Sequence, residues 1–114
     1  MIKMKIEVGE YIRTKQGTIG KTIEKYEKYC VISNTRGEID VPYENIAKYS
    51  KNIIDLIEVG DYVNGKKVLS VDYYGEVEVK DCEFINSNNI KTIVTKQQFS
   101  NMEYRVWVKK KRKQ

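Results

Sequence analysis

The chain has 114 residues, of which 40% are hydrophobic and none is histidine. This length permits one domain, or at most two very small ones near the lower limit for a core that folds alone. The chain contains no run of about 18 apolar residues, the length that would span a bilayer, and its N-terminal residues lack the apolar core of a secretion signal. We therefore expect a soluble, cytoplasmic protein.

The net charge of +5 is confined to the C-terminal end of the chain. Lys109–Lys113 contribute five positive charges, and the rest of the chain balances 16 basic against 16 acidic residues. Such a terminus is commonly a solvated tail, but it can also tether nucleic acid by electrostatic attraction. We treat residues 109–114 as a basic tail.

The first half of the chain alternates polar and apolar residues with period two and is rich in β-branched and aromatic side chains, which predicts strands. We expect strands at residues 9–14, 18–26, 29–34 and 38–42. Gly37 supplies the positive backbone angle that the turn before the fourth strand needs. The segment "PYENI", which begins at Pro42, suits a single turn of tight helix, because the missing amide hydrogen of proline would be unbonded there.

The joint between the halves is "AKYSKNIIDLI", which has no glycine, proline or serine-rich run and is too apolar for a flexible linker. We expect it to carry the last strand of the first half directly into the first strand of the second. The two halves should then pack rigidly, with Ile54 and Leu56 on one buried face.

The second half repeats this plan. We expect an opening strand in "GDYVNG" from Gly60, strands at residues 66–72, 76–84 and 90–95, and a final strand at 103–108. The segment "TKQQFSNM" before the final strand predicts a helical turn with Thr95 as its cap.

An internal repeat underlies this plan, since "IEVGEYIRT" from Ile6 returns as "IEVGDYVNG" from Ile57. Gly9 and Gly60 should bend the chain into the first strand of each half. Ile12 and Val63 should then point inward, and the tyrosine before each of them should lie on the other face.

A second alignment extends the repeat toward the end of each half. Val41 is set against Val94, and Ile46 then falls on Phe99, so that the interval grows from 51 to 53 residues. A small loop insertion would produce that change.

The expected order of strands, with one helical turn before the last, resembles an SH3-like small barrel, most clearly in "GEYIRTKQGTIGK" and "EIDVPYENI". We therefore predict an all-β protein of two tandem SH3-like barrels of about five short strands each. The expected domains are residues 1–54 and 55–108, followed by the basic tail at 109–114.

The segments "YSKNIIDLIEVGDYVNGKKV" and "IKTIVTKQQFSNMEYRV" are similar to small uncharacterised proteins of phages and prophages of AT-rich Gram-positive bacteria. The abundance of lysine, isoleucine and asparagine beside the single alanine, Ala47, also suggests AT-rich codons. The resemblance implies a role in a bacterial host cell, in which proteins of this size often inhibit host defence, anti-CRISPR proteins among them. It implies no catalytic residue.

An enzyme is not expected. Histidine is absent, no phosphate-binding or nucleophile motif is present, and no cofactor or metal site is indicated. Glu76 and Glu78 share a strand face, but alternate acids on an exposed strand face are ordinary. Cys30 and Cys82 should be small buried thiols.

Two kinds of binding residue remain. In "EYRVWVKKKRK" the alternation places Trp107 beside Arg105 and Lys109, so that the ring could stack on bases while Lys109, Lys110, Lys111, Arg112 and Lys113 contact phosphate. The alternative is that Trp107 covers the seam between the barrels.

Tyrosines offer a surface for a protein partner instead, because tyrosine is enriched at interfaces, although it is also a common strand residue. Six tyrosines are candidates, and we take four of them as partner-binding residues. The six are Tyr11, Tyr26, Tyr29, Tyr62, Tyr73 and Tyr74, and the four are Tyr11, Tyr62, Tyr73 and Tyr74.

The sequence thus favours a non-enzymatic binding module of a phage or mobile element that occupies a surface of a host protein or ribonucleoprotein. The alternative is a nucleic-acid-binding accessory protein that uses the basic tail and Trp107.

Overall fold

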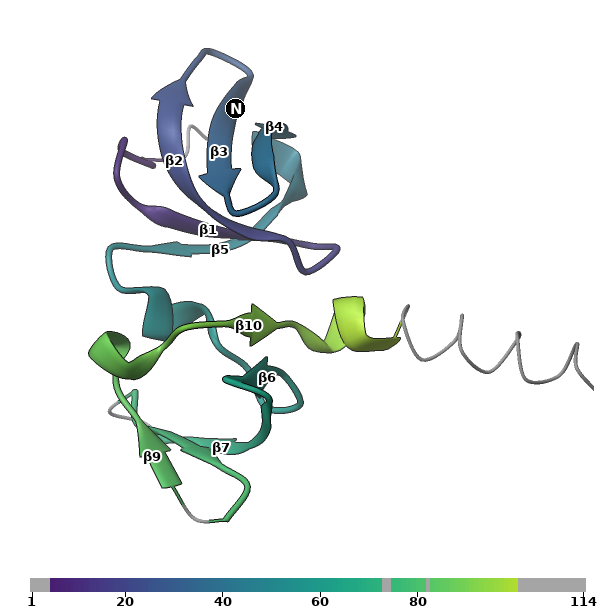
Figure 1. The fold of residues 1–114 in the computed structure, drawn as a ribbon. Helices are drawn as coiled ribbons and strands as arrows, with labels where there is room; N and C mark the ends of the chain where they lie inside the picture. Colours follow the sequence, from purple (N-terminus) through teal and green to yellow (C-terminus); the bar gives the residue numbers. More distant parts are fainter. Residues whose placement is uncertain (1–4, 73–74, 82, 101–114) are drawn as a thin grey trace, which may run out of the picture. The chain divides into compact units, whose positions relative to one another are not determined.

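The computed structural model describes residues 5–72, 75–81 and 83–100. The chain divides into two compact units between Leu56 and Ile57 (Figure 1). The predicted residues Tyr73, Tyr74, Cys82 and the whole segment from 101 to 114 lie outside the described part.

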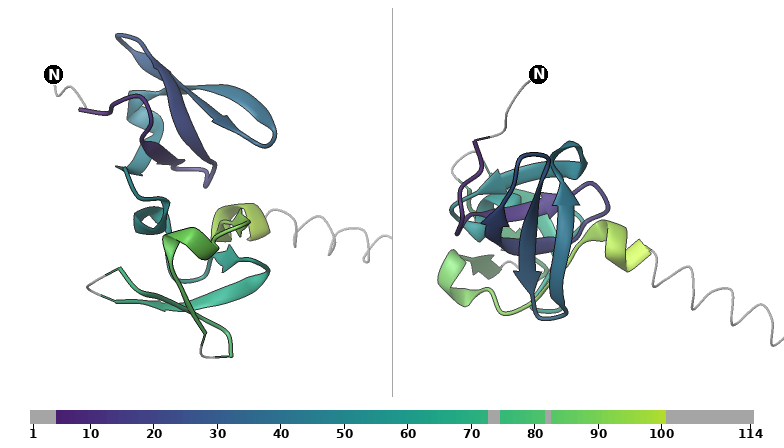
Figure 2. Two further views of the ribbon diagram at one scale, coloured as in Figure 1. Left: turned by 60° about the vertical axis from the view of Figure 1, so that its left-hand side comes forward. Right: turned by 90° about the horizontal axis from the view of Figure 1, so that it is seen from above.

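Unit 1 is a five-stranded antiparallel sheet in the order β4-β3-β2-β1-β5. Its elements are β1 (Tyr11–Thr14), β2 (Ile19–Lys25), β3 (Tyr29–Asn34), β4 (Gly37–Pro42), the 3-10 turn η1 (Tyr43–Asn45), β5 (Ile46–Ser50) and the 3-10 turn η2 (Ile53–Leu56). All four strands predicted for this half are present, and Gly37 has the expected positive φ of 123°. The views in Figure 2 show the long hairpin of β2 and β3.

The core of unit 1 consists of apolar side chains that alternate along the strands. Its members are Ile6, Ile12, Cys30, Ile32, Val41 and Ile46, with Tyr43 packed against them. Pro42 ends β4 in an extended conformation, so it lies one position before the helical turn and not inside it. The turn itself begins at Tyr43, as its sequence predicts within one residue.

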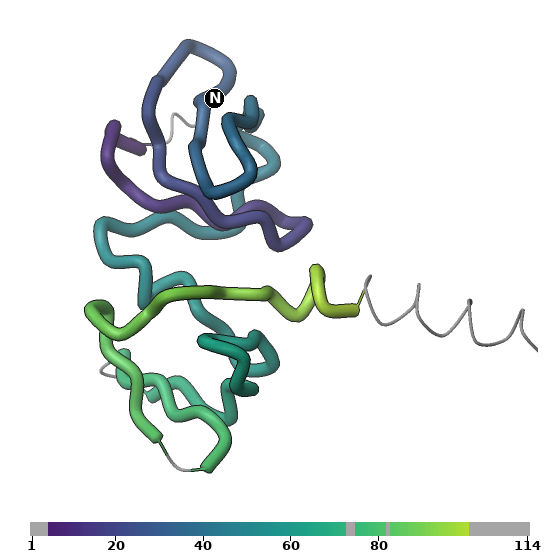
Figure 3. The backbone as a smooth tube through the Cα atoms, viewed as in Figure 1, coloured from purple at the N-terminus to yellow at the C-terminus, as the bar shows by residue number. Residues whose placement is uncertain are grey.

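Unit 2 is also a five-stranded antiparallel sheet, in the order β10-β6-β7-β8-β9. Its elements are β6 (Tyr62–Val63), β7 (Lys66–Val71), β8 (Val77–Val79), β9 (Glu83–Ile85), the 3-10 turn η3 (Ser87–Asn89) and β10 (Ile93–Val94), followed by helical residues 96–100. The chain passes from β9 through η3 into β10 (Figure 3). The two sheets therefore have the same strand order, with β6–β10 in the places of β1–β5.

The repeated phrase forms the same turn in both units. The amide of Glu10 donates to the carbonyl of Glu7, while the amide of Glu7 donates to Oε1 of Glu10 at 2.8 Å. Asp61 and Glu58 form the same reciprocal pair, with a distance of 2.7 Å from the Glu58 amide to Oδ2 of Asp61. The glycine at the third position of such a turn needs a positive φ, and glycine adopts it without strain.

The residues that flank these turns are placed as predicted. Gly9 and Gly60 have φ values of 99° and 97°. Ile12 and Val63 are fully buried, and the tyrosine before each is half-buried. The two units also share a bulge in the second strand, at Ile23 in β2 and at Leu69 in β7.

The predicted match of Val41 with Val94 is wrong. Val41 pairs with Cys30 in β3, and the residue with the same place in unit 2 is Ile85, which pairs with Val77 in β8. The interval between equivalent residues thus falls from 51 at the repeated glycines to 44 at this pair.

The physical cause is turn chemistry in the second half. Asn64 and Gly65, with φ values of 53° and 81°, close a two-residue hairpin that is shorter than the loop at 15–18. Asp81, with a φ of 74°, makes a second turn inside the segment that was predicted to be one strand at 76–84. Asparagine and aspartate tolerate this left-handed conformation better than other residues with side chains.

Two further predictions for the elements are corrected. The helical turn capped by Thr95 exists, but it follows the fifth strand, and η3 holds the place before that strand. The joint contains the 3-10 turn η2 and not a continuous strand; Leu56 is buried, whereas Ile54 is only half-buried. In the described part of the chain, no helix is long and apolar enough to cross a membrane.

Candidate interaction surfaces

The outer face of the unit 1 sheet is set by the alternation along β3. Cys30 and Ile32 point into the core, which turns Tyr29 and Val31 outward. Glu24 on β2 and Asp40 on β4 lie directly opposite Val31. Val31 is nevertheless only 6% exposed.

Tyr26 and Tyr29 form a stacked pair at the edge of this outer face. Their ring centroids are 4.9 Å apart at an interplanar angle of 27°. The amide of Tyr26 donates to the carbonyl of Tyr29 at 2.8 Å, which closes the turn between β2 and β3 and brings the rings together. Tyr26 is 45% exposed, so part of the aromatic surface faces solvent.

Two carboxylates, Glu24 and Asp40, lie close enough to act on Tyr26. The hydroxyl of Tyr26 donates to Oε2 of Glu24 at 2.9 Å. This hydrogen bond and the charges of Glu24 and Asp40 raise the pKa of Tyr26, because the phenolate would lose the bond and face negative charge. The surface therefore combines a partly exposed aromatic pair with two carboxylates.

Tyr43 anchors the turn from below. Its ring packs against the core, and its hydroxyl donates to the carbonyl of Tyr26. Burial is the main cause that raises the pKa of Tyr43, which keeps the hydroxyl a donor. Because the turn is held from the core side, Tyr26 and Tyr29 are ordered before any partner arrives, and less entropy is lost on binding.

An aromatic pair beside carboxylates is suited to cationic groups. The face of a tyrosine ring attracts a guanidinium or ammonium, and a carboxylate can accept its hydrogen bonds. Phosphate would be repelled by Glu24 and Asp40. The unit 1 surface, defined by Glu24, Tyr26, Tyr29 and Asp40, therefore favours arginine or lysine side chains of a protein.

The predicted tyrosines Tyr11 and Tyr62 lie in equivalent places, one in each unit. Nζ of Lys21 lies 5.7 Å from the ring centroid of Tyr11, so this ring already makes a cation–π contact within the chain. Tyr62 stacks on Phe99, with centroids 4.5 Å apart at 25°. Both rings therefore have internal contacts, and neither belongs to the Tyr26 pair.

Unit 2 has an outer face at the corresponding strands. Ser70 on β7, Glu78 on β8 and Phe84 on β9 lie opposite one another in a row, with Leu69 in the bulge beside Ser70. Val77 and Val79 point into the core, so Glu78 and the neighbouring Glu76 lie on the outer side, as their spacing predicts.

In residues 5–72, 75–81 and 83–100, no group of three or more His, Cys, Asp or Glu side chains could hold a metal ion. Cys30 is fully buried, and burial raises the pKa of its thiol, which lowers the fraction present as the nucleophilic thiolate.

Several predicted site residues cannot be placed. Arg105, Trp107, the cations of the basic tail, Tyr73 and Tyr74 all lie outside the described residues.

Comparison of the chain with protein-family models, with curated proteins and with solved structures finds no match in any of the three. The geometry of the two outer faces is therefore the basis of the functional argument.

Sequence reasoning considered Tyr26 and Tyr29 but did not select them, and it missed Tyr43 and Phe84. Tyr26 and Tyr29 flank a short polar segment between two predicted strands, which is the arrangement that brings two rings together across a hairpin turn. Phe84 shares the parity of Glu76 and Glu78, so the alternation along the predicted strand at 76–84 is the signal that could have found it.

Proposed function

We propose that the protein is a non-enzymatic binding module that occupies a basic surface of a host protein or ribonucleoprotein. The observation that carries this proposal is the unit 1 surface, in which a stacked tyrosine pair stands beside two carboxylates. Each unit is proposed to be an SH3-like small barrel, which the five antiparallel strands and the 3-10 turn before the fifth strand support.

The proposed setting is a phage or another mobile element of an AT-rich Gram-positive bacterium. The abundance of lysine, isoleucine and asparagine and the resemblance of the second half to phage proteins support this setting. Defence proteins that bind nucleic acid must present lysine and arginine to phosphate. A rigid acidic and aromatic surface fits such a region, which makes an anti-defence inhibitor, such as an anti-CRISPR protein, the class of function we propose.

The test is capture of binding proteins from a bacterial lysate with the parent chain and the variants Tyr26→Ala and Tyr49→Ala. Tyr49 is a matched control because it is 40% exposed and lies in the same unit. We expect Tyr26→Ala to weaken capture by about threefold or more, since an exposed cation–π contact is lost. Tyr49→Ala should capture as the parent does.

Nuclease treatment of the lysate separates the two kinds of partner. Capture of a protein should survive the treatment, and capture through nucleic acid should not. If Tyr26→Ala and Tyr49→Ala behave alike in nuclease-treated lysate, the unit 1 surface is not the binding site.

A nucleic-acid-binding accessory protein is the second candidate, favoured by the five cations at Lys109–Lys113. Binding of single-stranded nucleic acid should then fall steeply with salt, and deletion of residues 109–114 should flatten that dependence. Trp107→Ala should separately remove roughly 1–3 kcal/mol of stacking. A parent chain that fails to shift single-stranded DNA or RNA at low salt would rule this candidate out.

A further inference from the structure

We propose that the outer face of unit 2 is a second docking surface, which binds a partner segment that carries an apolar side chain next to lysine or arginine. The unit 2 surface is defined by Leu69, Ser70, Glu76, Glu78 and Phe84. It stands on residues other than those of the unit 1 surface and can be tested independently of it.

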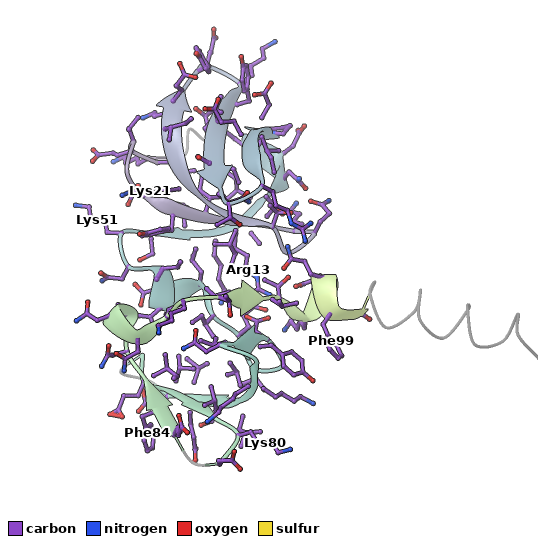
Figure 4. All side chains as sticks on the ribbon, viewed as in Figure 1. Arg13, Lys21, Lys51, Lys80, Phe84 and Phe99 are labelled. Atoms are coloured by element: carbon purple, nitrogen blue, oxygen red, sulfur yellow. The ribbon has the colours of Figure 1, made fainter. Side chains whose placement is uncertain are left out.

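The apolar part of this surface consists of Phe84 and Leu69. Phe84 is 62% exposed, more than any other large hydrophobic residue described, and lies on the outside of the edge strand β9 (Figure 4). Leu69 is 49% exposed and lies in the bulge of β7, between Ser70 and the buried Val68. Apolar residues exposed on one sheet face mark interaction sites more often than isolated ones do.

The charged part consists of Glu78 and Glu76. Glu78 lies directly opposite Phe84, and the hydroxyl of Ser70 donates to its Oε1 at 3.2 Å, which orients the carboxylate. Within the described residues, no lysine or arginine forms an ion pair with Glu76 or Glu78. By contrast, the nearby carboxylate of Glu83 is already neutralised by Lys66.

The charge of the surrounding segment points in the same direction. Residues 72–83 carry five carboxylates, of which Glu83 is paired with Lys66, and one lysine, Lys80. A basic partner segment would therefore be attracted to this part of unit 2, and an acidic one repelled. Charge complementarity thus selects a basic partner, and Phe84 requires an apolar side chain beside its cation.

The equivalent positions in unit 1 carry different side chains, so the same strand order does not by itself require the residues of the unit 2 surface. Val31, which holds the place of Glu78, is covered, and Asp40 holds the place of Phe84. The framework is shared, whereas the outer face differs in chemistry. Exposure of a phenylalanine on β9 is thus a property of this sequence and not a requirement of the sheet.

The test measures binding of a fluorescein-labelled octapeptide of alternating arginine and leucine to the full chain by fluorescence anisotropy. Two octapeptides serve as controls. Alternating arginine and serine removes the apolar side chains, and alternating glutamate and leucine replaces the positive charges with negative ones. The protein variants are Phe84→Ala, Glu78→Gln, Tyr26→Ala and Val59→Ala. Val59 is the matched control, because it is 53% exposed and belongs to unit 2 but not to this surface.

We expect the arginine–leucine peptide to bind more tightly than both control peptides. Phe84→Ala should weaken its binding about tenfold, because the apolar anchor is lost. Glu78→Gln should weaken binding and reduce its dependence on salt. Val59→Ala should have no effect, and circular dichroism should show all variants folded.

Two results would overturn the proposal. One is equal affinity of the parent and Phe84→Ala for the peptide. If Tyr26→Ala abolishes binding in that case, the peptide binds at the unit 1 surface and not at the unit 2 surface. The other is a concentration-dependent dimer of the parent that Phe84→Ala dissolves, since the face would then be covered by a second copy of the chain.

Discussion

Replacing Asp61 with alanine should destabilise unit 2, because this carboxylate holds two segments of the unit together. Asp61 is fully buried. Its Oδ2 accepts the amide of Glu58 at 2.7 Å, and its Oδ1 accepts the amide of Lys96, at the start of the helical residues, at 2.9 Å. Alanine removes both acceptors and leaves two amides to find other partners.

The size of the effect follows from these two bonds. A hydrogen bond to a charged group contributes about 1.5–3 kcal/mol. Water can reach the exposed residue Lys96 and replace part of the loss, so we expect a decrease of roughly 2–4 kcal/mol in the free energy of unfolding. Within the described residues, the carboxylate of the equivalent Glu10 in unit 1 accepts one amide, the exposed amide of Glu7, and Glu10→Ala should cost about 1 kcal/mol or less.

Hydrogen exchange with mass spectrometry is the assay, because it reports each unit separately. In Asp61→Ala, peptides from β6–β8 should lose protection while those from β1–β5 keep it. Urea denaturation followed by circular dichroism gives the free energies. Equal losses in Asp61→Ala and Glu10→Ala would refute the reasoning, since the two residues differ in burial and in the number of amides they accept.

Three further predictions concern unit 1. Gly20→Ala should cost about 1–3 kcal/mol in urea denaturation, because a Cβ atom would lie 3.0 Å from Cδ1 of Ile32 and from a backbone oxygen; an unchanged midpoint would contradict this. Leu56→Ala should cost about 2–5 kcal/mol and Ile54→Ala less, since only Leu56 is fully buried, and equal melting temperatures would show that this burial is not stabilising. Burial raises the pKa of Cys30 above the unfolded-state value of about 8.5. The protonated thiol therefore contributes fully to stability below that pH, and the contribution is lost as the pH rises through the folded-state pKa. Thermal melts between neutral and alkaline pH should show a flatter pH dependence for Cys30→Ala than for the parent.

Much of unit 1 could be predicted from the sequence, because period-two alternation, Gly37 and Pro42 all favour the same elements. The repeated phrase was equally informative, because its glycine and its acidic residue both serve the same turn. The glycine adopts the positive φ, and the acidic side chain of Glu10 or Asp61 accepts the first amide of the turn. Both signals are local, and local signals are the ones that a single sequence expresses.

The second half was harder because its turns contain no proline and depend on residues with side chains in left-handed conformations. Asn64 and Asp81 carry two of these turns. Because the predicted strand at 76–84 includes Asp81, every later strand is counted one place too early, and Val41 is matched with the wrong residue. The stacked pair of Tyr26 and Tyr29 was not predicted, because its geometry depends on the turn that Tyr43 anchors from a later element.

Asn64 also has a chemical consequence. An asparagine followed by glycine is prone to deamidation, which requires the amide nitrogen of Gly65 to attack the side-chain carbonyl. In the folded unit this side chain donates to the carbonyl of Asn89 and accepts the amides of Lys91 and Thr92, which holds it away from that geometry. Deamidation of Asn64 therefore requires opening of unit 2, and its rate should measure how often unit 2 unfolds.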